Sequence, residues 1–354
     1  MTTLQMTRRV GMCDMVKVIT FGEIMLRLAP QGYLRFFQND MLEATFGGGE
    51  ANVAVSLANF GIEAAFVTKL PDNDIGTAAV NELRKFGVDT AHIVRGGERM
   101  GIYFLEKGAS QRASKVIYDR KYSSIAEADE GDFDWSEIFA GYGFFHFTGI
   151  TPAISDKAAK VTLEALKAAK SKGWTVSCDL NYRKNLWTTE KAGRVMRELM
   201  PYVDVLIANE EDSEKVFGIK ADGSDITGGE ISHDGYVKVA KRLYEEFGFK
   251  KVTITLRESK TANDNVWGAM IYNGEATHFS KKYDVHIVDR VGGGDSFAAG
   301  LIYGLITGMN DADAVEFATA ASCLKHSIEG DFNRVSVAEV KALLKGDGSG
   351  RVQR

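Results

Sequence analysis

Along most of the chain, short apolar runs rich in β-branched residues alternate with longer stretches in which apolar residues recur at helical spacing. Runs of the first kind are typical of buried strands, and stretches of the second kind are typical of amphipathic helices. This alternation predicts a mostly parallel sheet covered by helices on both faces. The predicted strands are Val16–Phe21, Ala65–Thr68, Phe144–Phe147, Thr175–Cys178, Val205–Ala208 and Lys251–Thr255, and the predicted helices are Ala51–Phe60, Asp74–Phe86, Ser155–Lys172, Thr189–Met200 and Gly235–Phe247.

The pattern changes in the C-terminal third of the chain. Trp267–Tyr272 and Glu275–Phe279 flank Asn273-Gly274, which is a strong hairpin-turn signal. Three helices are expected after this hairpin: Ser296–Thr307, Ala312–Ser327, and one opened by Ser336, with Glu339 in the capping-box position.

Two segments, Met25–Phe37 and Ile102–Tyr122, alternate apolar and polar residues without a helix between their strand-like parts. The alternation predicts antiparallel strands outside the main sheet. We expect these two insertions, about 24–38 and 100–123, to pair in space as a small β-sheet lid over a single domain spanning 15–345. Residues 1–14 and 346–354 are expected to be flexible tails.

Composition narrows the class of protein. The 354 residues are 45% hydrophobic and 26% charged, as in ordinary globular proteins, and the net charge of −5 gives no indication of a nucleic-acid partner. No apolar run has the length of a membrane span, and the N-terminal residues lack the apolar segment of a signal peptide. The three cysteines have no paired spacing, which argues against a disulfide framework and suits a reducing, cytoplasmic compartment.

The most informative stretch is Asp289-Arg290-Val291-Gly292-Gly293-Gly294-Asp295, which precedes an apolar helix. Consecutive glycines lose much backbone freedom on folding, so a chain tends to keep them where a ligand approaches the backbone closely. A glycine-rich turn that opens a helix presents N–H groups and the positive end of the helix dipole, which favour phosphate oxygens. Asp295 is placed to accept the proton of a hydroxyl group that attacks a bound phosphate.

Asp295 taken alone is better explained as a helix N-cap. A second cluster, Gly47-Gly48-Gly49-Glu50-Ala51-Asn52, also opens a helix (Val53–Phe60) and shifts the balance towards a ligand site. Neither cluster carries the Lys-Ser/Thr of a Walker A loop. No G-x-G-x-x-G follows the first strand, which argues against a dinucleotide-dependent dehydrogenase.

Together the two clusters resemble the signatures of the ribokinase (PfkB) family of sugar kinases. Gly48-Gly49-Glu50-Ala51-Asn52 matches the N-terminal signature, and Asp289 through Asp295 matches the C-terminal one. The resemblance runs from Val16 to about Leu344. Four further segments are similar to the sugar-acid kinases of the family: Phe21-Gly22-Glu23, His146-Phe147-Thr148-Gly149-Ile150, Asp179-Leu180-Asn181-Tyr182-Arg183 and Asn209-Glu210-Glu211-Asp212.

The resemblance implies a three-layer α/β/α sandwich with a β-sheet lid, and transfer of a phosphoryl group from Mg-ATP to a hydroxyl of 2-keto-3-deoxygluconate. It implies that Asp295 is the base and that Gly292, Gly293 and Gly294 form an anion hole. The implied sugar-binding residues are Gly48, Gly49, Asn52, Tyr103, Tyr118, Arg120, Arg183 and Asp295. The implied ATP-binding residues are Asn181, Asn209, Arg257, Gly292 and Gly294, and Asp212 is the implied metal ligand. Whether a monovalent cation assists near the Asp289 loop stays open.

The chain departs from the family pattern in two places. Asp212 stands where the family often has glutamate. The segment after Thr255, a glycine-bearing nucleotide loop in relatives, reads Leu256-Arg257-Glu258-Ser259-Lys260 and has no glycine until Gly268.

Several of these residues have other interpretations. Tyr103 and Tyr118 lie in alternating strands, where tyrosine is common for packing alone. Arg183 is expected near the carboxyl edge of the sheet, where its two-pronged guanidinium suits a planar carboxylate. Arg120 is expected either to share that role or to hold the lid closed.

The sequence therefore predicts an ATP-dependent sugar kinase. The alternatives are a fructokinase or another sugar or nucleoside kinase of the same family, and a sugar-binding regulator without catalysis, against which the intact Asp295 and Gly292–Gly294 argue. Apolar lid residues that a monomer would leave in water predict a homodimer or larger homo-oligomer with the lids face to face. These residues are Ile102, Phe104, Leu105 and Ile117.

Overall fold

The computed structural model of the protein describes residues 16–220 and 233–346. The tails predicted at 1–14 and 346–354 lie outside this range, apart from Gly346. No helix in the described part of the chain is both long and apolar enough to cross a membrane.

Among the described residues the main sheet has nine strands, and its centre is parallel, in the order β12-β11-β10-β9-β1-β4. Antiparallel strands extend it at one side, where β13 pairs with β12, and β14 and β15 both pair with β13. The strands are β1 Val18–Phe21, β4 Ala64–Val67, β9 Phe144–Thr148, β10 Thr175–Asp179, β11 Val205–Ala208, β12 Lys251–Ser259, β13 Asp264–Tyr272, β14 Thr277–Phe279 and β15 Tyr283–His286. The predicted mostly parallel sheet and the hairpin at Asn273-Gly274 are confirmed.

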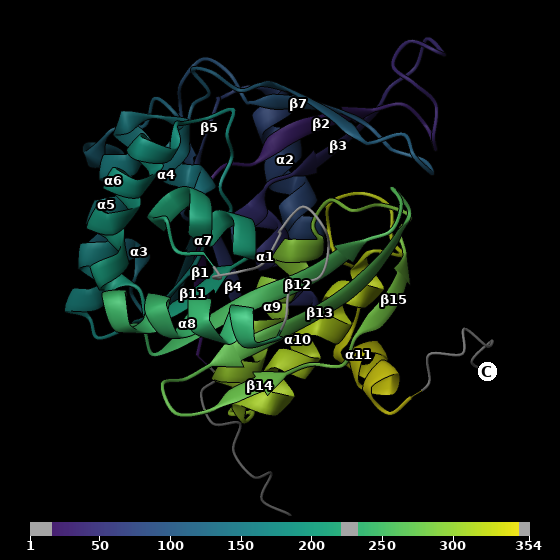
Figure 1. Cartoon of the computed structure of the whole chain (residues 1–354). Coiled ribbons are helices and arrows are strands. Elements are labelled where there is room, and N and C mark those ends of the chain that lie inside the picture. The colour runs from purple at the N-terminus through teal and green to yellow at the C-terminus, as the bar shows by residue number, and fades with distance from the viewer. Residues whose placement is uncertain (1–15, 221–232, 347–354) are drawn as a thin grey trace, which may run out of the picture.

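Helices cover both faces of this sheet, which gives the predicted α/β/α sandwich (Figure 1). One hydrophobic core lies between the sheet and α3, α5, α6 and α8, and the other between the sheet and α1, α2, α9, α10 and α11. The helices are α1 Gly49–Asn59, α2 Asp74–Lys85, α3 Trp135–Ile138, α4 Ile150–Ile154, α5 Asp156–Ser171, α6 Thr189–Leu199, α7 Glu210–Phe217, α8 His233–Phe247, α9 Gly293–Ile306, α10 Asp311–Lys325 and α11 Val337–Leu344.

Local sequence signals set most helix ends. Ser336 and Glu339 form the predicted capping box, in which Glu339 Oε2 accepts the Ser336 N–H at 2.8 Å. The two glycine clusters behave differently from the prediction, because α1 and α9 begin at Gly49 and Gly293 instead of after the clusters. The last glycines of each cluster thus belong to the first turn of a helix.

A second, four-stranded sheet forms the lid, in the order β3-β2-β7-β8. Its strands are β2 Met25–Ala29, β3 Glu43–Gly47, β7 Ile102–Glu106 and β8 Lys115–Asp119, and a separate two-stranded sheet pairs β5 Lys69–Leu70 with β6 Val94–Arg95. The two insertions therefore do pair in space, but β2 and β7 run parallel, which the sequence did not predict. The second strand of the first insertion also lies beyond 24–38, because Pro30 and Gly32, with its φ of 56°, turn the chain after β2.

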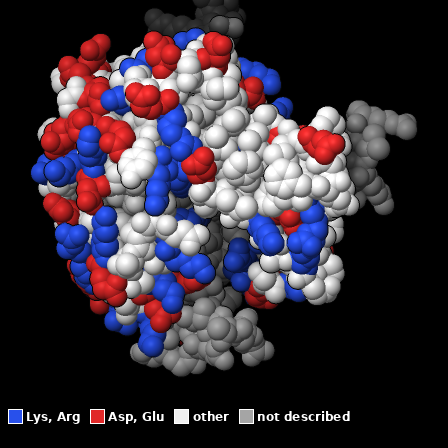
Figure 2. All heavy atoms as spheres, turned by 90° about the horizontal axis from the view of Figure 1, so that it is seen from above, with Lys and Arg blue, Asp and Glu red and all other residues white. Residues whose placement is uncertain are grey.

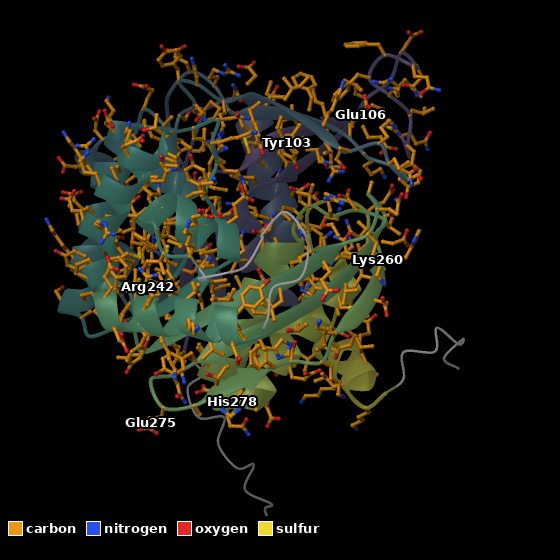
Figure 3. The ribbon with its side chains drawn as sticks, in the orientation of Figure 1. Tyr103, Glu106, Arg242, Lys260, Glu275 and His278 are labelled. Carbon is orange, nitrogen blue, oxygen red and sulfur yellow. The ribbon has the colours of Figure 1, made fainter. Side chains whose placement is uncertain are left out.

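The lid lies over the end of the main sheet at which the parallel strands end (Figure 1). Tyr103 and Glu106 mark the lid, and Glu275 and His278 mark the opposite end of the molecule (Figure 3). Ligands of open α/β sheets bind at the carboxyl ends of the strands. A ligand-binding site is therefore expected between these strand ends and the lid.

Candidate active site

The N-termini of α1 and α9 meet under the lid, and one hydrogen bond joins them. Asn52, in the first turn of α1, donates from Nδ2 to Asp295 Oδ2 at 2.6 Å. The same amide accepts the Gly48 N–H through Oδ1 at 3.3 Å, which fixes its orientation. The two glycine clusters of the sequence thus come together around Asp295, although 243 residues separate Asn52 from Asp295.

Asp295 is not the N-cap of its helix. Gly292 takes that position with a left-handed φ of 82°, no side chain caps the helix, and Asp295 lies inside the first turn. The N-cap interpretation is therefore wrong. The Asp295 carboxylate does not cap the helix and can interact with a ligand at the positive end of the helix dipole. Burial raises the pKa of Asp295 to about 6, against the opposing effects of the Asn52 hydrogen bond and the charges of Arg183 and Lys325.

The three glycines before Asp295 have different reasons to lack a side chain. A Cβ on Gly292 would lie 2.1 Å from the Asp331 carbonyl oxygen, and a Cβ on Gly293 would lie 2.6 Å from the His326 ring. Gly294 is exposed, and a Cβ there would meet no heavy atom within 4 Å. Two glycines therefore let the loop pack tightly on what lies beneath it, and the third leaves the backbone open on the side that faces solvent.

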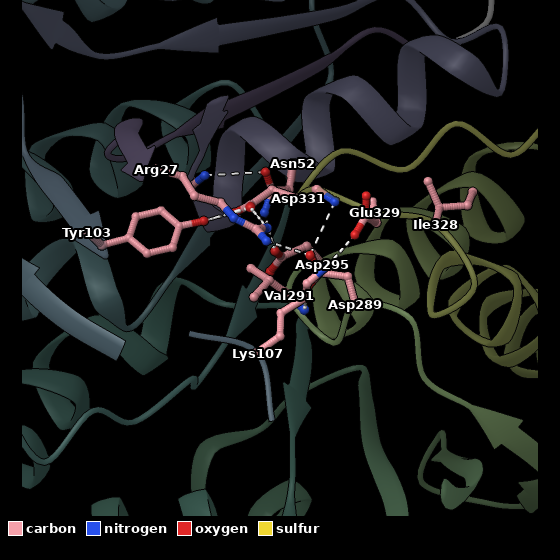
Figure 4. Close-up of polar contacts among 12 residues, drawn as sticks. Arg27, Asn52, Tyr103, Lys107, Asp289, Val291, Asp295, Ile328, Glu329 and Asp331 are labelled. Carbon is pink, nitrogen blue, oxygen red and sulfur yellow. Dashed lines mark hydrogen bonds and ion pairs between the residues drawn. The ribbon is translucent and has the colours of Figure 1, made fainter. Parts of the chain in front are cut away.

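A buried ion cluster connects the lid to this loop (Figure 4). Arg27, on β2, donates to Asp289 Oδ2 at 2.6 Å and to Asp331 Oδ1 at 2.7 Å. Tyr103, on β7, donates its hydroxyl to Asp331 at 2.6 Å, and the small lid core packs against Val291. Sequence reasoning missed this cluster. The sequence held a weak signal for Arg27, because Met25 and Ala29 are apolar and share its face of the strand, but Asp331 carried none.

A buried carboxyl group ties the first turn of α1 to the end of β9. Glu50 Oε1 accepts hydrogen bonds from the Thr148 N–H, the Thr148 hydroxyl and the Thr151 hydroxyl, at 2.6 to 2.9 Å. Burial raises the pKa of Glu50 to about 7. A Cβ on Gly22 would lie 2.2 Å from this carboxyl group, which explains the glycine after β1. Glu50 was part of the recognised motif, but its role could not be read from the sequence.

Arg183 follows β10 as predicted and is exposed at the carboxyl edge of the sheet. Its charge acts on both Asp179 and Asp295, so it faces the region around the candidate base. Asp179, at the end of β10, has its pKa raised by burial and by the neighbouring charges of Asp212 and Asp295. Asn181 has a left-handed backbone, with φ of 42°, which turns the chain from β10 towards Arg183.

Asp212 has a structural partner on each side. Its Oδ1 accepts the Tyr182 N–H at 3.2 Å, and its Oδ2 accepts from Asn209 Nδ2 at 2.9 Å. Asn209 is the N-cap of α7 and accepts the Asp212 N–H at 2.7 Å. No group of three or more His, Cys, Asp or Glu side chains within residues 16–220 and 233–346 could hold a metal ion. The predicted metal ligand is thus first of all part of a helix cap.

The predicted lid residues differ in what they contact. Both Nε and Nη2 of Arg120 donate to Glu23 Oε2, and both side chains are buried. The guanidinium of Arg120 is therefore engaged in an ion pair within the protein. Of the two expected roles of Arg120, sharing the substrate carboxylate or holding the lid closed, this pairing favours the second. Tyr103 is likewise occupied by Asp331, whereas Tyr118 is exposed on β8, with its ring centroid 6.1 Å from that of Tyr103.

Two arginines, Arg257 and Arg290, place positive charge beside the glycine loop. Arg257 is exposed on β12, which extends to Ser259, so the segment after Thr255 is a strand and not a loop. Its charge acts on Arg290 and on His326, which places it beside the glycine loop. Arg290 donates to the Ala262 carbonyl at 2.8 Å, and neither arginine has an ion-pair partner in the described part of the chain. Arg290 lay within the motif, but sequence reasoning did not single it out.

Comparison with known proteins supports one family. The sequence model of the family described as "pfkB family carbohydrate kinase" matches residues 15–333. A 2-dehydro-3-deoxygalactonokinase from Haloferax volcanii is 33% identical over 94% of this chain and 98% of its own length. A 2-dehydro-3-deoxygluconokinase from Bacillus subtilis is 27% identical over 91% of this chain and 93% of its own. The crystal structure of a 2-dehydro-3-deoxygluconokinase from Thermotoga maritima is 54% identical, with a TM-score of 0.90 over 94% of this chain and 100% of that one.

Proposed function

Because the chain belongs to the pfkB family of carbohydrate kinases, we propose that it transfers the terminal phosphoryl group of ATP to a hydroxyl group of 2-keto-3-deoxygluconate. The observation that carries the proposal is the Asp295 carboxylate, held by Asn52 at the N-terminus of α9 beside Gly292–Gly294. A pKa of about 6 leaves this group ionised, and still basic, at neutral pH.

In the proposed reaction Asp295 accepts the proton of the sugar hydroxyl. The hydroxyl oxygen forms a bond to the γ-phosphorus while the bond from that phosphorus to the bridging oxygen breaks, and ADP leaves with the electron pair. The negative charge of the transferring group faces the backbone of Gly292, Gly293 and Gly294 and the helix dipole of α9. Asn52 keeps Asp295 oriented through its two hydrogen bonds.

For ATP, the proposed ligands are Asn181, Asn209, Arg257, Gly292 and Gly294, to which the structure leads us to add Arg290. Magnesium commonly binds to nucleotide phosphates with one or two protein carboxylates and several waters. Asp212 and the neighbouring Asp179 would hold the ion, which neutralises phosphate charge when bound. A monovalent cation near the Asp289 loop stays a prediction, to be checked by assays in potassium, sodium and tetramethylammonium salts.

For the sugar, we propose that Arg183 binds the carboxylate and that Gly48, Gly49, Asn52 and Tyr118 line the rest of the pocket. Arg120 and Tyr103 support the lid in this proposal, because their polar groups are bound to Glu23 and Asp331. The relatives differ in the configuration of one carbon, since some are named for the gluconate sugar and one for the galactonate sugar. The 54% identity favours the gluconate form, and the galactonate form is the second candidate.

The test is an assay that couples ADP release to NADH oxidation, with 2-keto-3-deoxygluconate, 2-keto-3-deoxygalactonate, fructose and a nucleoside as acceptors. Turnover with a sugar acid supports the proposal, and turnover with fructose alone would replace it. Asp295→Asn should lower kcat by about a hundred- to ten-thousand-fold with little change in nucleotide affinity. Sugar binding without turnover in the wild type would favour the regulator.

We further propose that two copies of the chain associate through their lids. The surface seen from above has a broad area without charged side chains (Figure 2). Val116, Ile117 and Tyr118 of β8, the edge strand of the lid, are exposed, as is Tyr122. Leu105, which the sequence suggested as an interface residue, is instead buried within the lid, and Ile102 and Phe104 are half-buried. An exposed apolar edge strand is a common site of association.

A further inference from the structure

The last turn of α10 forms the floor beneath the glycine loop. The Ser322 hydroxyl donates to the Gly293 carbonyl at 2.7 Å, and the His326 carbonyl accepts the Val288 N–H at 2.8 Å. Lys325 lies directly under Gly292, because a Cβ on that glycine would be 3.3 Å from Lys325 Cε. Ser322 is uncharged, and burial lowers the pKa of His326 to about 4, so Lys325 is the charged group of this turn.

Lys325 is fully buried, at 0% exposure, and it has no ion pair with any carboxylate in residues 16–220 and 233–346. Its Nζ donates to the Ile328 carbonyl at 3.1 Å. Burial lowers its pKa, while the charges of Asp289, Asp331 and Asp295 oppose that change and Arg27 adds to it. Lysine has an ordinary pKa of about 10.4, so its pKa can fall some way before the ammonium group is lost at neutral pH. A buried lysine without an ion pair is rare, and it calls for a reason.

The negative charges near Lys325 give a reason for burying its ammonium group. Arg27 neutralises only one of the two carboxylates that it joins, Asp289 and Asp331, so the cluster under the lid keeps one negative charge. The C-terminal end of α10 adds the negative end of a helix dipole below the loop. Both would repel the phosphoryl group and raise the pKa of Asp295, and Asp331 does raise it. The Lys325 ammonium has the opposite sign and lowers the pKa of Asp295.

We propose that Lys325 is a positioning residue of the phosphoryl transfer, whose buried ammonium cancels the remaining negative charge under the Gly292–Gly294 loop. In this role it keeps Asp295 ionised and the loop receptive to an anion, without touching substrate. The inference rests on the proposed kinase function.

The experiment compares Lys325→Gln, which can still donate to the Ile328 carbonyl, and Lys325→Met with the wild-type enzyme. Other groups that face Asp295 stay in place: Asn52 from α1, Asp179 and Arg183 from the end of β10, and Asp331 from the segment after α10. We expect the acid limb of the kcat/KM profile to move up by about 0.5 to 1 pH unit. We also expect kcat at pH 7.5 to fall about tenfold or more, with the KM values for ATP and sugar within about threefold.

Lys251→Met is the matched control, because Lys251 is a partly buried lysine paired with Asp311 at the start of β12, outside the site. It should leave the acid limb where it is. If Lys325→Gln and Lys325→Met lower the melting temperature but leave the acid limb and kcat unchanged, Lys325 contributes only to stability and the proposal fails. An inactive wild-type enzyme with every sugar would instead refute the kinase function itself.

If neither Lys325 variant folds, the proposal is tested by NMR on enzyme that retains Lys325. In protein labelled with carbon-13 at lysine Cε, we expect one lysine signal, that of the buried Lys325, to shift on introducing Asp295→Asn and to remain that of an ammonium at pH 7.5. If every lysine signal stays unshifted, or the responding lysine is neutral at that pH, the proposal is overturned.

Discussion

Removing the guanidinium of Arg27 should destabilise the protein strongly. In Arg27→Met the carboxylates of Asp289 and Asp331 would lose the group that binds both, at 2.6 and 2.7 Å. The side chains of all three residues are at most 5% exposed, so water cannot replace the lost partner. Breaking a buried pair by removing one partner typically costs 3–5 kcal/mol, so we expect a loss of about that size in the free energy of unfolding.

The pH dependence of this loss has a definite sign. Burial already raises the pKa of Asp331 in the folded state, and the Arg27 charge opposes that rise, so removing Arg27 raises this pKa further and the folded variant takes up a proton more readily. A group with a raised folded-state pKa loses its stabilising effect as the pH rises through that pKa. The variant should therefore be further below the wild type at pH 8 than at pH 5.

The assay is equilibrium unfolding in urea, followed by tryptophan fluorescence and analysed by linear extrapolation. Arg99→Met is the matched control, because Arg99 pairs with Asp119 at 2.8 Å on the surface of the same lid, with both side chains at least a third exposed. An exposed pair typically contributes about 0–1 kcal/mol, and this variant should lose no more. If Arg27→Met also loses less than about 1 kcal/mol, the buried cluster does not hold the lid to the loop and the reasoning is wrong.

Three further predictions concern activity and assembly. The kcat/KM of the wild-type enzyme should fall as the pH drops through about 6, because burial raises the pKa of Asp295 to that value and protonation removes the base; a flat profile down to pH 4.5 would exclude this assignment. The efficiency with 2-keto-3-deoxygluconate should exceed that with fructose at least about tenfold, and Arg183→Ala should erase most of this preference by removing a charge-assisted bond to the carboxylate, with fructose kinetics as the control. Light scattering should give at least a dimer at micromolar concentration, and Ile117→Glu should shift it towards the monomer; a monomeric wild type would refute association through the lid.

Much of the fold was accessible from the sequence because it depends on local patterns. Apolar runs such as Val205–Ala208 became central strands with the predicted bounds, and Ser336 with Glu339 formed a capping box from residues three positions apart. The glycine clusters and Asp295 were also recognisable, since a phosphate-binding helix start needs particular residues in one short segment. What the sequence determined by itself was therefore the order of strands and helices and the residues that form the two glycine-rich helix starts.

Other features depend on residues that meet only in the folded chain. Whether Asp295 was a helix cap or a carboxylate held in the site was decided by Gly292, which takes the cap position, and by Asn52, 243 positions away, which donates to Asp295. Arg27 and Asp331 are 304 positions apart, and Arg120 finds Glu23 at a separation of 97. A charged residue looks the same in a sequence whether it lies in water or in a core. Only burial gives these charges their partners and shifted pKa values, and burial is a property of the tertiary structure.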